Sequence, residues 1–346
     1  MAIWNDVPVD SLESVIAAAP PEDLEAVLFG TRDPSVIADV LGSIVAASIG
    51  ADVVGVRWYT SSPAAVAAVV LGDGRSVVVR AYQQSVNPAF IDGVIRVQHH
   101  LVDKGVPCAG PLGGTVIVDG AGNSVLGRVE SLVPDPGARR FDPDEMAMSA
   151  SGLATIVRLA AGVDTAGLET HPMVLPDLAS QLYPAPHSPL FDFDATAAGA
   201  EWIDDIARAA RQAITHDGAV IADGDWSARN VRLNRNGLLA VFDFESLHYA
   251  SESMSVGAAA ATSRALGEEG EPDAPSADEI TRFVAAYEVA RGEAFTPSQR
   301  NSARAAALFV LAYTARCEHS LEPGVRTGRA SGRLASDPQM LSLLEE

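Results

Sequence analysis

The spacing of apolar and polar residues changes along the chain and predicts different elements in different places. Residues 9–48 place apolar side chains three to four positions apart behind Ser or Asp, as in "DPSVIADVLGSIVAASIG", which is typical of amphipathic helices. Residues 52–60, 65–71 and 75–82 are instead rich in β-branched and aromatic residues. The segments "SSPAA" and "GDG" separate them, so the pattern predicts three strands joined by a loop and a tight turn.

A helix is expected next, followed by two more strands. Residues 88–104 keep a helical period, begin with Pro88 and are stopped by Gly105. Residues 114–133, "GTVIVDGAGNSVLGRVESLV", contain two β-rich segments around a Gly/Asn turn. The Pro, Gly and Asp residues of the following "PDPGARRFDP" mark the expected end of the β-rich lobe.

Beyond this breaker the pattern becomes helical. Ala-rich segments with helical spacing cover residues 143–161, 195–215, 276–292 and 297–320. We therefore expect an α+β fold with a small β-rich lobe and a larger helical lobe. The expected parts are an N-terminal helical extension at 1–50, an N-lobe at 51–133 and a C-lobe at 134–346.

Net charge narrows the range of partners. The 346 residues carry a formal charge of −21, which argues against nucleic acid, because that binding is driven by cationic residues that neutralise phosphates. A strongly acidic chain suits a cationic small molecule, and it equally well only keeps a protein soluble. Of the 24 basic residues, one is a lysine, Lys104, and all others are arginine.

Cysteine usage and hydropathy point to the cytoplasm. Cys108 and Cys317 are the only cysteines, too few for a disulfide framework or a cysteine metal site. No apolar stretch approaches the length of a membrane span, and "MAIWNDVPVDSLESV" has no basic segment followed by an apolar one. We expect a cytoplasmic protein that does not contact membranes.

The segment "DGDWSARNVRLNRNGLLAVFDFES", residues 223–246, carries the candidate chemistry. Asn230 lies five residues after Asp225, and Asp243 lies thirteen residues after Asn230. "VRL" and "LLAVFDF" between and after them predict the two strands of a hairpin. The acids are either ordinary surface residues of this hairpin or part of a catalytic loop that holds a metal.

This spacing resembles the catalytic and metal-binding loops of the protein-kinase-like superfamily. It is most similar to the aminoglycoside phosphotransferase and choline kinase branch, whose loop typically reads H-G-D-x-x-x-x-N followed by an I-D-W/F-E segment. The order of the lobes matches over roughly residues 50–320, and the motif itself matches around 223–245. The resemblance implies a bilobal protein-kinase-like fold with ATP or GTP and Mg²⁺ as cofactors.

The resemblance also assigns roles to single residues. Asp225 takes or orients the proton of the acceptor hydroxyl, because phosphoryl transfer needs an anion beside the incoming oxygen. Asn230 supplies an amide oxygen and Asp243 a carboxylate to Mg²⁺, which prefers hard oxygen ligands. Glu245 stands where this branch often has an acid and is a candidate second-sphere or substrate contact.

Two positions depart from the family pattern. Asp223 stands where the family has a histidine that mainly holds the loop, and an Asp that accepts hydrogen bonds from backbone N–H groups is an expected substitute. The family's phosphate-binding lysine on the third strand is replaced by Arg80 of "VVVRAY". Arginine binds phosphate with a planar fork in place of a point charge. The alternative is that Arg80 is a surface residue of the strand.

The acid that pairs with the family's lysine is also missing. It is expected near Val94, and Asp92 and Gln98 are its possible replacements. Ser61 and Ser62, in the loop between the first two strands, are candidate phosphate contacts, although hairpin loops are often Ser-rich.

The segment "RVESLV" fits the connection between the lobes. In relatives, backbone groups at this place bind adenine, which implicates the carbonyl of Glu130 and the N–H of Leu132. Packing between adjacent strands would explain the same residues.

The acceptor site is expected on the helical lobe. Trp226 either lines the pocket or packs under the loop. The segment "YPAPHSPLFDF" is read as a pocket wall or, with more weight, as a buried crossing segment. Glu318 is a substrate candidate on a late helix, beside His319, for which a structural role is favoured.

The expected function is an ATP- and Mg²⁺-dependent kinase for a small-molecule hydroxyl, such as an aminoglycoside-like antibiotic, an amino sugar or a nucleoside. The alternative is a catalytically inactive nucleotide-binding relative, which Asp223, Arg80 and the missing helix acid would suit. Retention of Asp225, Asn230 and Asp243 separates the two, since a drifting protein has no physical reason to keep both metal ligands. Protein kinase activity is disfavoured, because "FES" follows Asp243 and no activation segment is evident.

Overall fold

The computed structural model resolves two compact units, each of which is described by itself. The first comprises residues 1–137 and 163–168, and the second comprises residues 138–162 and 169–346. The structure describes residues 9–18, 23–62, 64–168, 181–184, 191–264, 274–324, 326 and 329–344. The segment "YPAPHSPLFDF" at 183–193 and the acidic segment "GEEGEPDAPSADE" at 267–279, whose composition predicts a polar connector, lie in part outside the described residues.

The first unit is built on a five-stranded antiparallel sheet with the order β1-β2-β3-β5-β4. All five strands that the pattern predicts are present. Their bounds are β1 Val53–Ser62, β2 Ala64–Leu71, β3 Ser76–Tyr82, β4 Val116–Asp119 and β5 Ser124–Ser131. The α+β prediction is confirmed for this unit.

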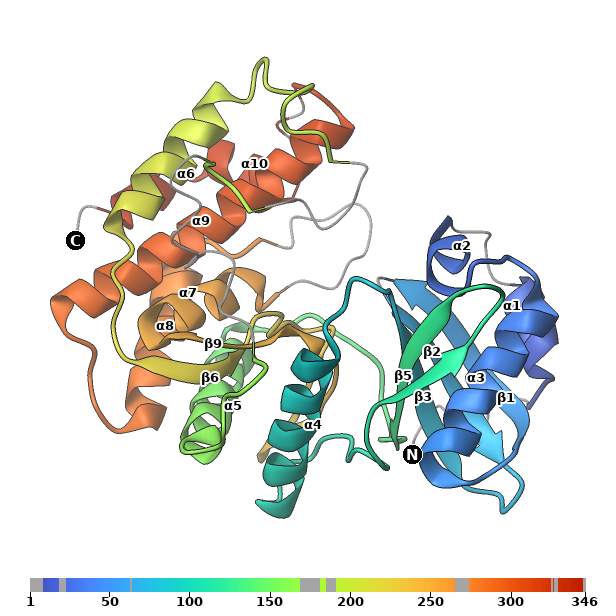
Figure 1. Ribbon diagram of the computed structural model, residues 1–346. Helices are drawn as coiled ribbons and strands as arrows, with labels where there is room; N and C mark the ends of the chain where they lie inside the picture. The colour runs from blue at the N-terminus through green and yellow to red at the C-terminus, as the bar shows by residue number, and fades with distance from the viewer. Residues whose placement is uncertain are drawn as a thin grey trace. The chain divides into compact units, whose positions relative to one another are not determined.

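Three N-terminal helices cover one face of this sheet (Figure 1). They are α1 Leu12–Ala18, α2 Asp23–Phe29 and α3 Pro34–Ile49. Their apolar faces share one core with alternate sheet residues, among them Val79, Ala81 and Val129. Gly127 of β5 allows the closest approach, because a Cβ there would lie 2.6 Å from Cδ1 of Ile44. Residues 1–50 therefore belong to the same compact unit as the sheet.

The other face of the sheet carries α4 (Pro88–Asp103) and a second, smaller core. Ile91 and Ile95 of α4 pack against Tyr82 and Leu126. Segment 163–168 closes over α4 from outside, and Gly93 permits this, because a Cβ there would lie 3.2 Å from the carbonyl oxygen of Ala166. Helix α4 is thus fixed between the sheet and this segment.

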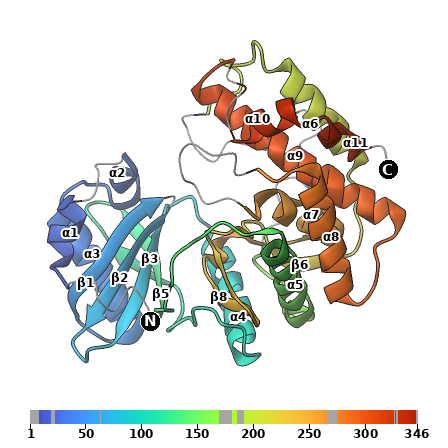
Figure 2. The same cartoon turned by 180° about the vertical axis from the view of Figure 1, so that it is seen from behind.

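The second unit is mainly helical, as predicted. Helices α7 and α9 and helices α5 and α8 form its main packed pairs, and α6 and α10 pack on α9 (Figure 2). The bounds are α5 Pro143–Ala160, α6 Glu201–Ala213, α7 Glu252–Thr262, α8 Ala277–Arg291, α9 Pro297–Leu321, α10 Arg329–Ser336 and α11 Gln339–Ser342. Helices α5, α8 and α9 begin with capping boxes, which the sequence signals through Asp142, Ser276 and Thr296.

Four short strands of this unit hold the candidate loop. The predicted hairpin is present as β7 (Val231–Asn234) and β8 (Gly237–Val241). The sequence did not predict the second pair, β6 (Ala219–Asp223) with β9 (Leu247–Ser251), which are antiparallel. A short 3-10 helix, η4 (Phe244–Ser246), joins β8 to β9.

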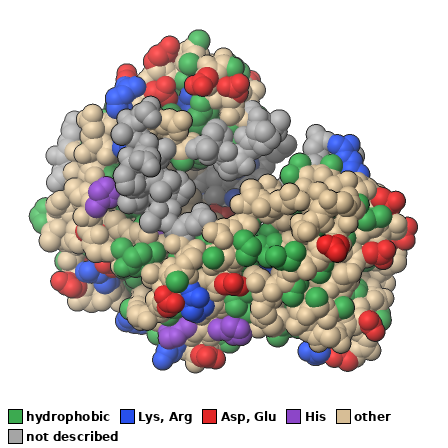
Figure 3. Space-filling model, in the orientation of Figure 1, with side chains coloured by type: hydrophobic (Ala, Val, Ile, Leu, Met, Phe, Trp, Pro, Cys, Tyr) green, Lys and Arg blue, Asp and Glu red, His purple; other side chains and the backbone are tan. Residues whose placement is uncertain are grey.

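On the face drawn in Figure 3, acidic, basic and hydrophobic side chains are interspersed among the described residues. Among the described residues, no helix is long and apolar enough to cross a membrane.

Candidate functional site

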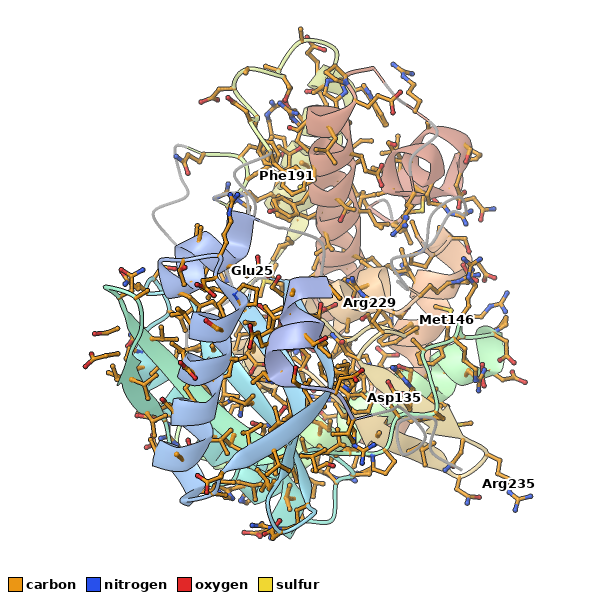
Figure 4. All side chains as sticks on the ribbon, turned by 90° about the vertical axis from the view of Figure 1, so that its right-hand side faces the viewer. Glu25, Asp135, Met146, Phe191, Arg229 and Arg235 are labelled. Atoms are coloured by element: carbon orange, nitrogen blue, oxygen red, sulfur yellow. The ribbon has the colours of Figure 1, made fainter. Side chains whose placement is uncertain are left out.

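The candidate loop, residues 224–230, connects β6 to the β7–β8 hairpin within the second unit. At the base of the hairpin, the N–H of Phe242 donates to the carbonyl of Asn230 at 2.8 Å. Asn230 precedes β7 and Asp243 follows β8, so the hairpin holds both residues at the same end. Figure 4 shows Arg235 at the opposite end, at the turn, with its side chain directed outward.

Asp225 and Asn230 are joined side chain to side chain. The Nδ2 atom of Asn230 donates to Oδ2 of Asp225 at 2.8 Å and to the carbonyl of the same residue at 3.1 Å. Both contacts use the amide nitrogen, so the Oδ1 atom of Asn230 points the other way. Neither contact uses the amide oxygen of Asn230.

Asp243 has an unusual backbone conformation. Its φ of 58° and ψ of 67° lie in the left-handed region, and it is the one non-glycine residue with positive φ among the described residues. A residue with a Cβ pays roughly 1–3 kcal/mol for such strain, which persists only where the surroundings impose it and which clusters at functional sites. Here β8 before it and the buried Phe244 after it fix the chain.

The donor atoms fit a hard divalent cation. Asn230 offers an amide oxygen and Asp243 a carboxylate, and both side chains are half-buried at one end of the hairpin. Mg²⁺ is usually held by one or two carboxylates together with substrate phosphates. In the part of the chain that the structure describes, no cluster of three or more His, Cys, Asp or Glu side chains forms a complete metal site.

Asp223, at the position of the family's histidine, is 1% exposed and holds the start of the loop. Its Oδ1 atom accepts the N–H of Asp225 at 2.9 Å, which is the contact expected of an Asp at this position. Its Oδ2 atom is buried without a hydrogen bond. Burial is the main cause that raises the pKa of Asp223 to about 8; the N–H of Asp225 opposes it, and the nearby carboxylates of Asp225 and Glu245 add to it. Burial therefore favours the protonated form of Asp223.

Trp226 and Glu318 do not have the surroundings of substrate contacts. Trp226 is 0% exposed, and its Nε1 donates to Oγ of Ser149 on α5 at 2.9 Å, so it packs under the loop. The carboxylate of Glu318 accepts the N–H groups of Ala330 and Ser331 at 2.9 Å each and so caps α10. For Trp226, the structure favours packing under the loop, one of the two alternatives that the sequence left open. For Glu318, we correct the expectation of a substrate contact, because its carboxylate is used at α10.

Glu245 keeps a position compatible with its expected role. It lies in η4, two residues after Asp243, and is half-buried. Its carboxylate is near enough to Asp223 to raise the pKa of that residue.

Arg80 lies on the α4 face of the sheet in the first unit, 9% exposed. Its neighbours Val79 and Ala81 point into the opposite core, as strand alternation requires. The Nε atom of Arg80 donates to Oε1 of Glu130 at 2.9 Å. Arg80 is thus a buried, paired guanidinium, and the alternative of a surface strand residue is wrong.

The acid paired with Arg80 comes from the sheet. Glu130 of β5 is 3% exposed and also bonds NH2 of Arg128 at 3.2 Å and Nε2 of Gln98 at 3.3 Å. Gln98 is thus part of the cluster, whereas Asp92 accepts from the hydroxyl of Thr115 at 2.7 Å. The expectation for Glu130 concerned its backbone carbonyl, and the structure adds a side-chain role that it missed.

Ser61 is on the wrong face for the role expected of it. Ser61 stands opposite Ala65 in the sheet, and Ala65 stands opposite Ala81. Directly opposite residues share a face, and Ala65 and Ala81 belong to the core with the N-terminal helices, so the side chain of Ser61 lies on that face too. There its Oγ donates to Oε1 of Glu25 at 2.7 Å. Figure 4 marks Glu25 on α2. We correct the phosphate role of Ser61, because Arg80 lies on the opposite face.

The remaining nucleotide candidates are less defined. The side chain of Ser62 lies outside the described residues. Leu132 follows the end of β5 and is half-buried.

The sequence did contain a signal for the cluster around Arg80. Arg128 and Glu130 are charged residues two apart in the otherwise largely apolar "SVLGRVES", so they share a face of β5. Arg80 stands opposite Arg128 in the sheet. Arg80, Arg128 and Glu130 come together because β5 lies beside β3, and the sequence alone does not reveal this strand order.

Comparisons with known proteins agree with this geometry. A family model described as the phosphotransferase enzyme family (APH) matches residues 64–300. No curated protein matches the sequence.

Solved structures match the fold at low sequence identity. A microcompartment-associated aminopropanol kinase has a TM-score of 0.57 and 13% identity, with 90% of this chain and 93% of that chain covered. An amicoumacin kinase, hAmiN, in complex with AMP-PNP, Ca²⁺ and Ami has a TM-score of 0.54 and 14% identity, with 84% of this chain and 88% of that chain covered. A thermostable mutant of the aminoglycoside phosphotransferase APH(4)-Ia, in its apo form, has a TM-score of 0.51 and 13% identity, with 88% and 98% covered. The expected kinase-like fold is confirmed.

Proposed function

Because the chain belongs to the phosphotransferase enzyme family, we propose that it transfers the γ-phosphoryl group of ATP to a hydroxyl group of a small molecule in a Mg²⁺-dependent reaction. The observation that carries the proposal is the joining of Asp225 to Asn230 beside the strained Asp243. This arrangement gathers hard oxygen donors at one end of the β7–β8 hairpin. A hairpin with a purely structural role does not need them there.

Asp225 is the proposed catalytic residue. Its carboxylate orients the acceptor hydroxyl and takes its proton as the oxygen attacks the γ-phosphorus and the bond to the nucleoside diphosphate breaks. The amide of Asn230 holds one carboxylate oxygen, Oδ2, at 2.8 Å. That contact fixes the plane of the carboxylate, which favours a single orientation of the acceptor.

Asn230 and Asp243 are the proposed ligands of Mg²⁺. The bound ion would neutralise charge on the β- and γ-phosphates. Glu245, two residues later on η4, is the proposed second-sphere or acceptor contact.

Arg80 is the proposed contact to the α- and β-phosphates of the nucleotide. Its pairing with Glu130 at 2.9 Å replaces the lysine–glutamate pair of the family. Since one carboxylate oxygen holds Nε, the guanidinium is oriented before the phosphates arrive. The N–H of Leu132, the carbonyl of Glu130 and Ser62 complete the proposed contacts.

The acceptor is proposed among aminoglycoside-like antibiotics, amino sugars and nucleosides. A net charge of −21 favours the cationic members of this set. An acceptor of the first kind would make the protein a determinant of antibiotic resistance. The cytoplasm is the proposed location, and the buried free thiols of Cys108 and Cys317 suit a reducing compartment.

An inactive nucleotide-binding protein is the second candidate. Asp223 in place of the histidine and Arg80 in place of the lysine favour it, because both depart from the active family pattern. The proposed enzyme explains the strained Asp243, for which an inactive protein has no use.

A panel of acceptors decides between them. Purified protein is given ATP and Mg²⁺ with aminoglycosides, amino sugars, nucleosides or amino alcohols, and ATP consumption and thermal stability are measured together. Turnover with one class supports the proposed enzyme. Nucleotide-dependent stabilisation without turnover across the panel supports the inactive relative, and neither response would contradict both.

A further inference from the structure

The carbonyl of Ser246 is the point where the candidate loop meets the segment that carries Asp243. The N–H of Gly224, the first residue of the loop, donates to this carbonyl at 2.9 Å. Ser246 ends η4, which begins directly after Asp243. The placement of Asp225 relative to Asp243 therefore depends in part on this carbonyl.

His248 of β9 contacts the same carbonyl. Its Nδ1 lies 3.1 Å from the oxygen of Ser246, and its Nε2 lies 2.9 Å from Oγ of Ser255 on α7. A carbonyl oxygen only accepts hydrogen bonds, so Nδ1 must carry the hydrogen. Two lone pairs allow the carbonyl to accept from Gly224 and from His248 together.

The imidazole of His248 is neutral and closely packed. The residue is 4% exposed, and burial lowers its pKa to about 4. With Nδ1 protonated, Nε2 of the neutral ring is an acceptor facing Oγ of Ser255. The single hydroxyl hydrogen of Ser255 is shared between this nitrogen and the carbonyl of Ser251, 2.9 Å from Oγ. The ring also borders the loop directly, since a Cβ on Gly224 would lie 3.3 Å from Nδ1.

The strand that carries His248 is itself fixed. His248 stands opposite Ala222 in the β6–β9 pair, one residue before Asp223. The sequence offered no reason to connect it with the loop, because it lies 23 positions after Asp225 and outside the motif.

We propose that His248 is a positioning residue for phosphoryl transfer. Its Nδ1–H, acting through the carbonyl of Ser246, holds Gly224 and so fixes Asp225 relative to Asp243. The histidine that the family has at position 223 mainly holds the loop. Here His248 and Asp223 share that role: His248 holds Gly224 through the carbonyl of Ser246, and Asp223 accepts the N–H of Asp225. The inference rests on the proposed function.

A matched pair of amide variants tests it. In His248→Asn the side-chain N–H takes the place of Nδ1–H and keeps the contact to the carbonyl of Ser246. In His248→Gln the side-chain N–H takes the place of Nε2, so the contact to that carbonyl is lost. We expect His248→Asn to keep kcat within about threefold of wild type. We expect His248→Gln to lower kcat by about tenfold to a hundredfold with little change in the KM for nucleotide, because a displaced base misaligns the acceptor.

His319 provides a control for the loss of a buried histidine. It is 1% exposed on α9, and its Nε2 lies 3.2 Å from the carbonyl of Ala198, away from the loop. His319→Gln should lower thermal stability and leave kcat unchanged. Equal losses of kcat in the Asn and Gln variants of His248 would overturn the positioning role.

NMR separates this inference from the proposed function. The ring ¹⁵N shifts of wild type should report the Nδ1–H form, and the amide of Gly224 should exchange faster in His248→Gln than in His248→Asn. Both measurements are independent of turnover. An Nε2–H form, or equal exchange in the two variants, would overturn the inference even where the wild type is active. Absence of turnover in wild type, with the expected NMR result, would contradict only the enzymatic role.

Discussion

At the scale of single residues, the candidate site is a set of side chains whose hydrogen bonds fix their orientation. Asn230 uses its amide nitrogen on Asp225 and so turns its oxygen outward. Asp243 is held in a left-handed conformation that a free chain would avoid. These contacts make the roles of the residues testable one at a time.

Asp225→Asn should abolish phosphoryl transfer and leave the fold intact. The amide retains an oxygen that accepts from Asn230, but it cannot take a proton, so kcat should fall by about a hundredfold or more. Steady-state kinetics and thermal unfolding of the same preparations check this. Asp205→Asn, at an exposed acid of α6, is the matched control. Near-wild-type turnover of Asp225→Asn would remove Asp225 from its role.

Arg80→Ala should raise the KM for nucleotide and lower kcat, because a misplaced triphosphate reacts poorly. Arg80→Lys should retain part of the activity, since it restores a cation to a site shaped for a wider head group. Glu130→Gln should act through the same contact, so the double variant Arg80→Ala, Glu130→Gln should lose less than the sum of the two single losses. Additive losses would mean that the pair is not coupled.

Asp223→Asn should change how stability depends on pH. The pKa of Asp223 is raised from 3.8 to about 8 in the folded protein, so its protonated form stabilises the folded state. This stabilisation is complete below pH 3.8 and is lost as the pH rises from there to about 8. The Asn variant keeps an oxygen for the N–H of Asp225 and does not titrate. Its free energy of unfolding, relative to wild type, should therefore rise steadily between pH 5 and pH 8.5. A difference that stays constant over this range would show that Asp223 is ionised throughout.

At the scale of elements, the loop depends on helices that do not themselves carry chemistry. Helix α7 holds Ser255 against His248 and packs closely on α9. Gly257 makes that contact possible, because a Cβ there would lie 1.9 Å from the carbonyl oxygen of Ala303. The close crossing of α7 and α9 thus supports the strand on which His248 lies.

Gly257→Ala should destabilise the second unit by about 2 kcal/mol or more, since the helices must separate to admit a methyl group. Thermal or urea unfolding measures the change. Gly42→Ala, inside α3, is the contrasting variant, because no atom lies within 4 Å of its Cβ position. There the helix should gain about 0.5–1 kcal/mol. Similar effects at both positions would contradict the close packing of α7 on α9.

At the scale of the whole molecule, binding of Mg²⁺ and nucleotide should raise the stability of the protein. A ligand at a hundred times its dissociation constant adds about 2.7 kcal/mol. Asp243→Ala should lose the Mg²⁺-dependent part of this gain, because the carboxylate is the strongest proposed metal ligand. Calorimetry with and without Mg²⁺ measures it directly. An unchanged metal dependence in the variant would mean that Asp243 serves only the hairpin.

The local elements were largely readable from the sequence. Apolar periodicity predicted the five strands of the first sheet, and the spacing of Asp225, Asn230 and Asp243 predicted their place around the β7–β8 hairpin. These features depend on interactions within a few residues or across one turn. Such interactions leave a periodic or motif-like trace in the chain.

Tertiary structure alone decided which distant residues meet. Strand order placed Glu130 beside Arg80, and strand alternation turned Ser61 away from both. Burial assigned Trp226 to the fold, hydrogen bonds to the start of α10 assigned Glu318, and the β6–β9 pair brought His248 to the loop. The sequence determined what each residue is able to do, but a hydrogen bond or ion pair requires contact. Contact between residues far apart in the chain is set by how whole elements pack.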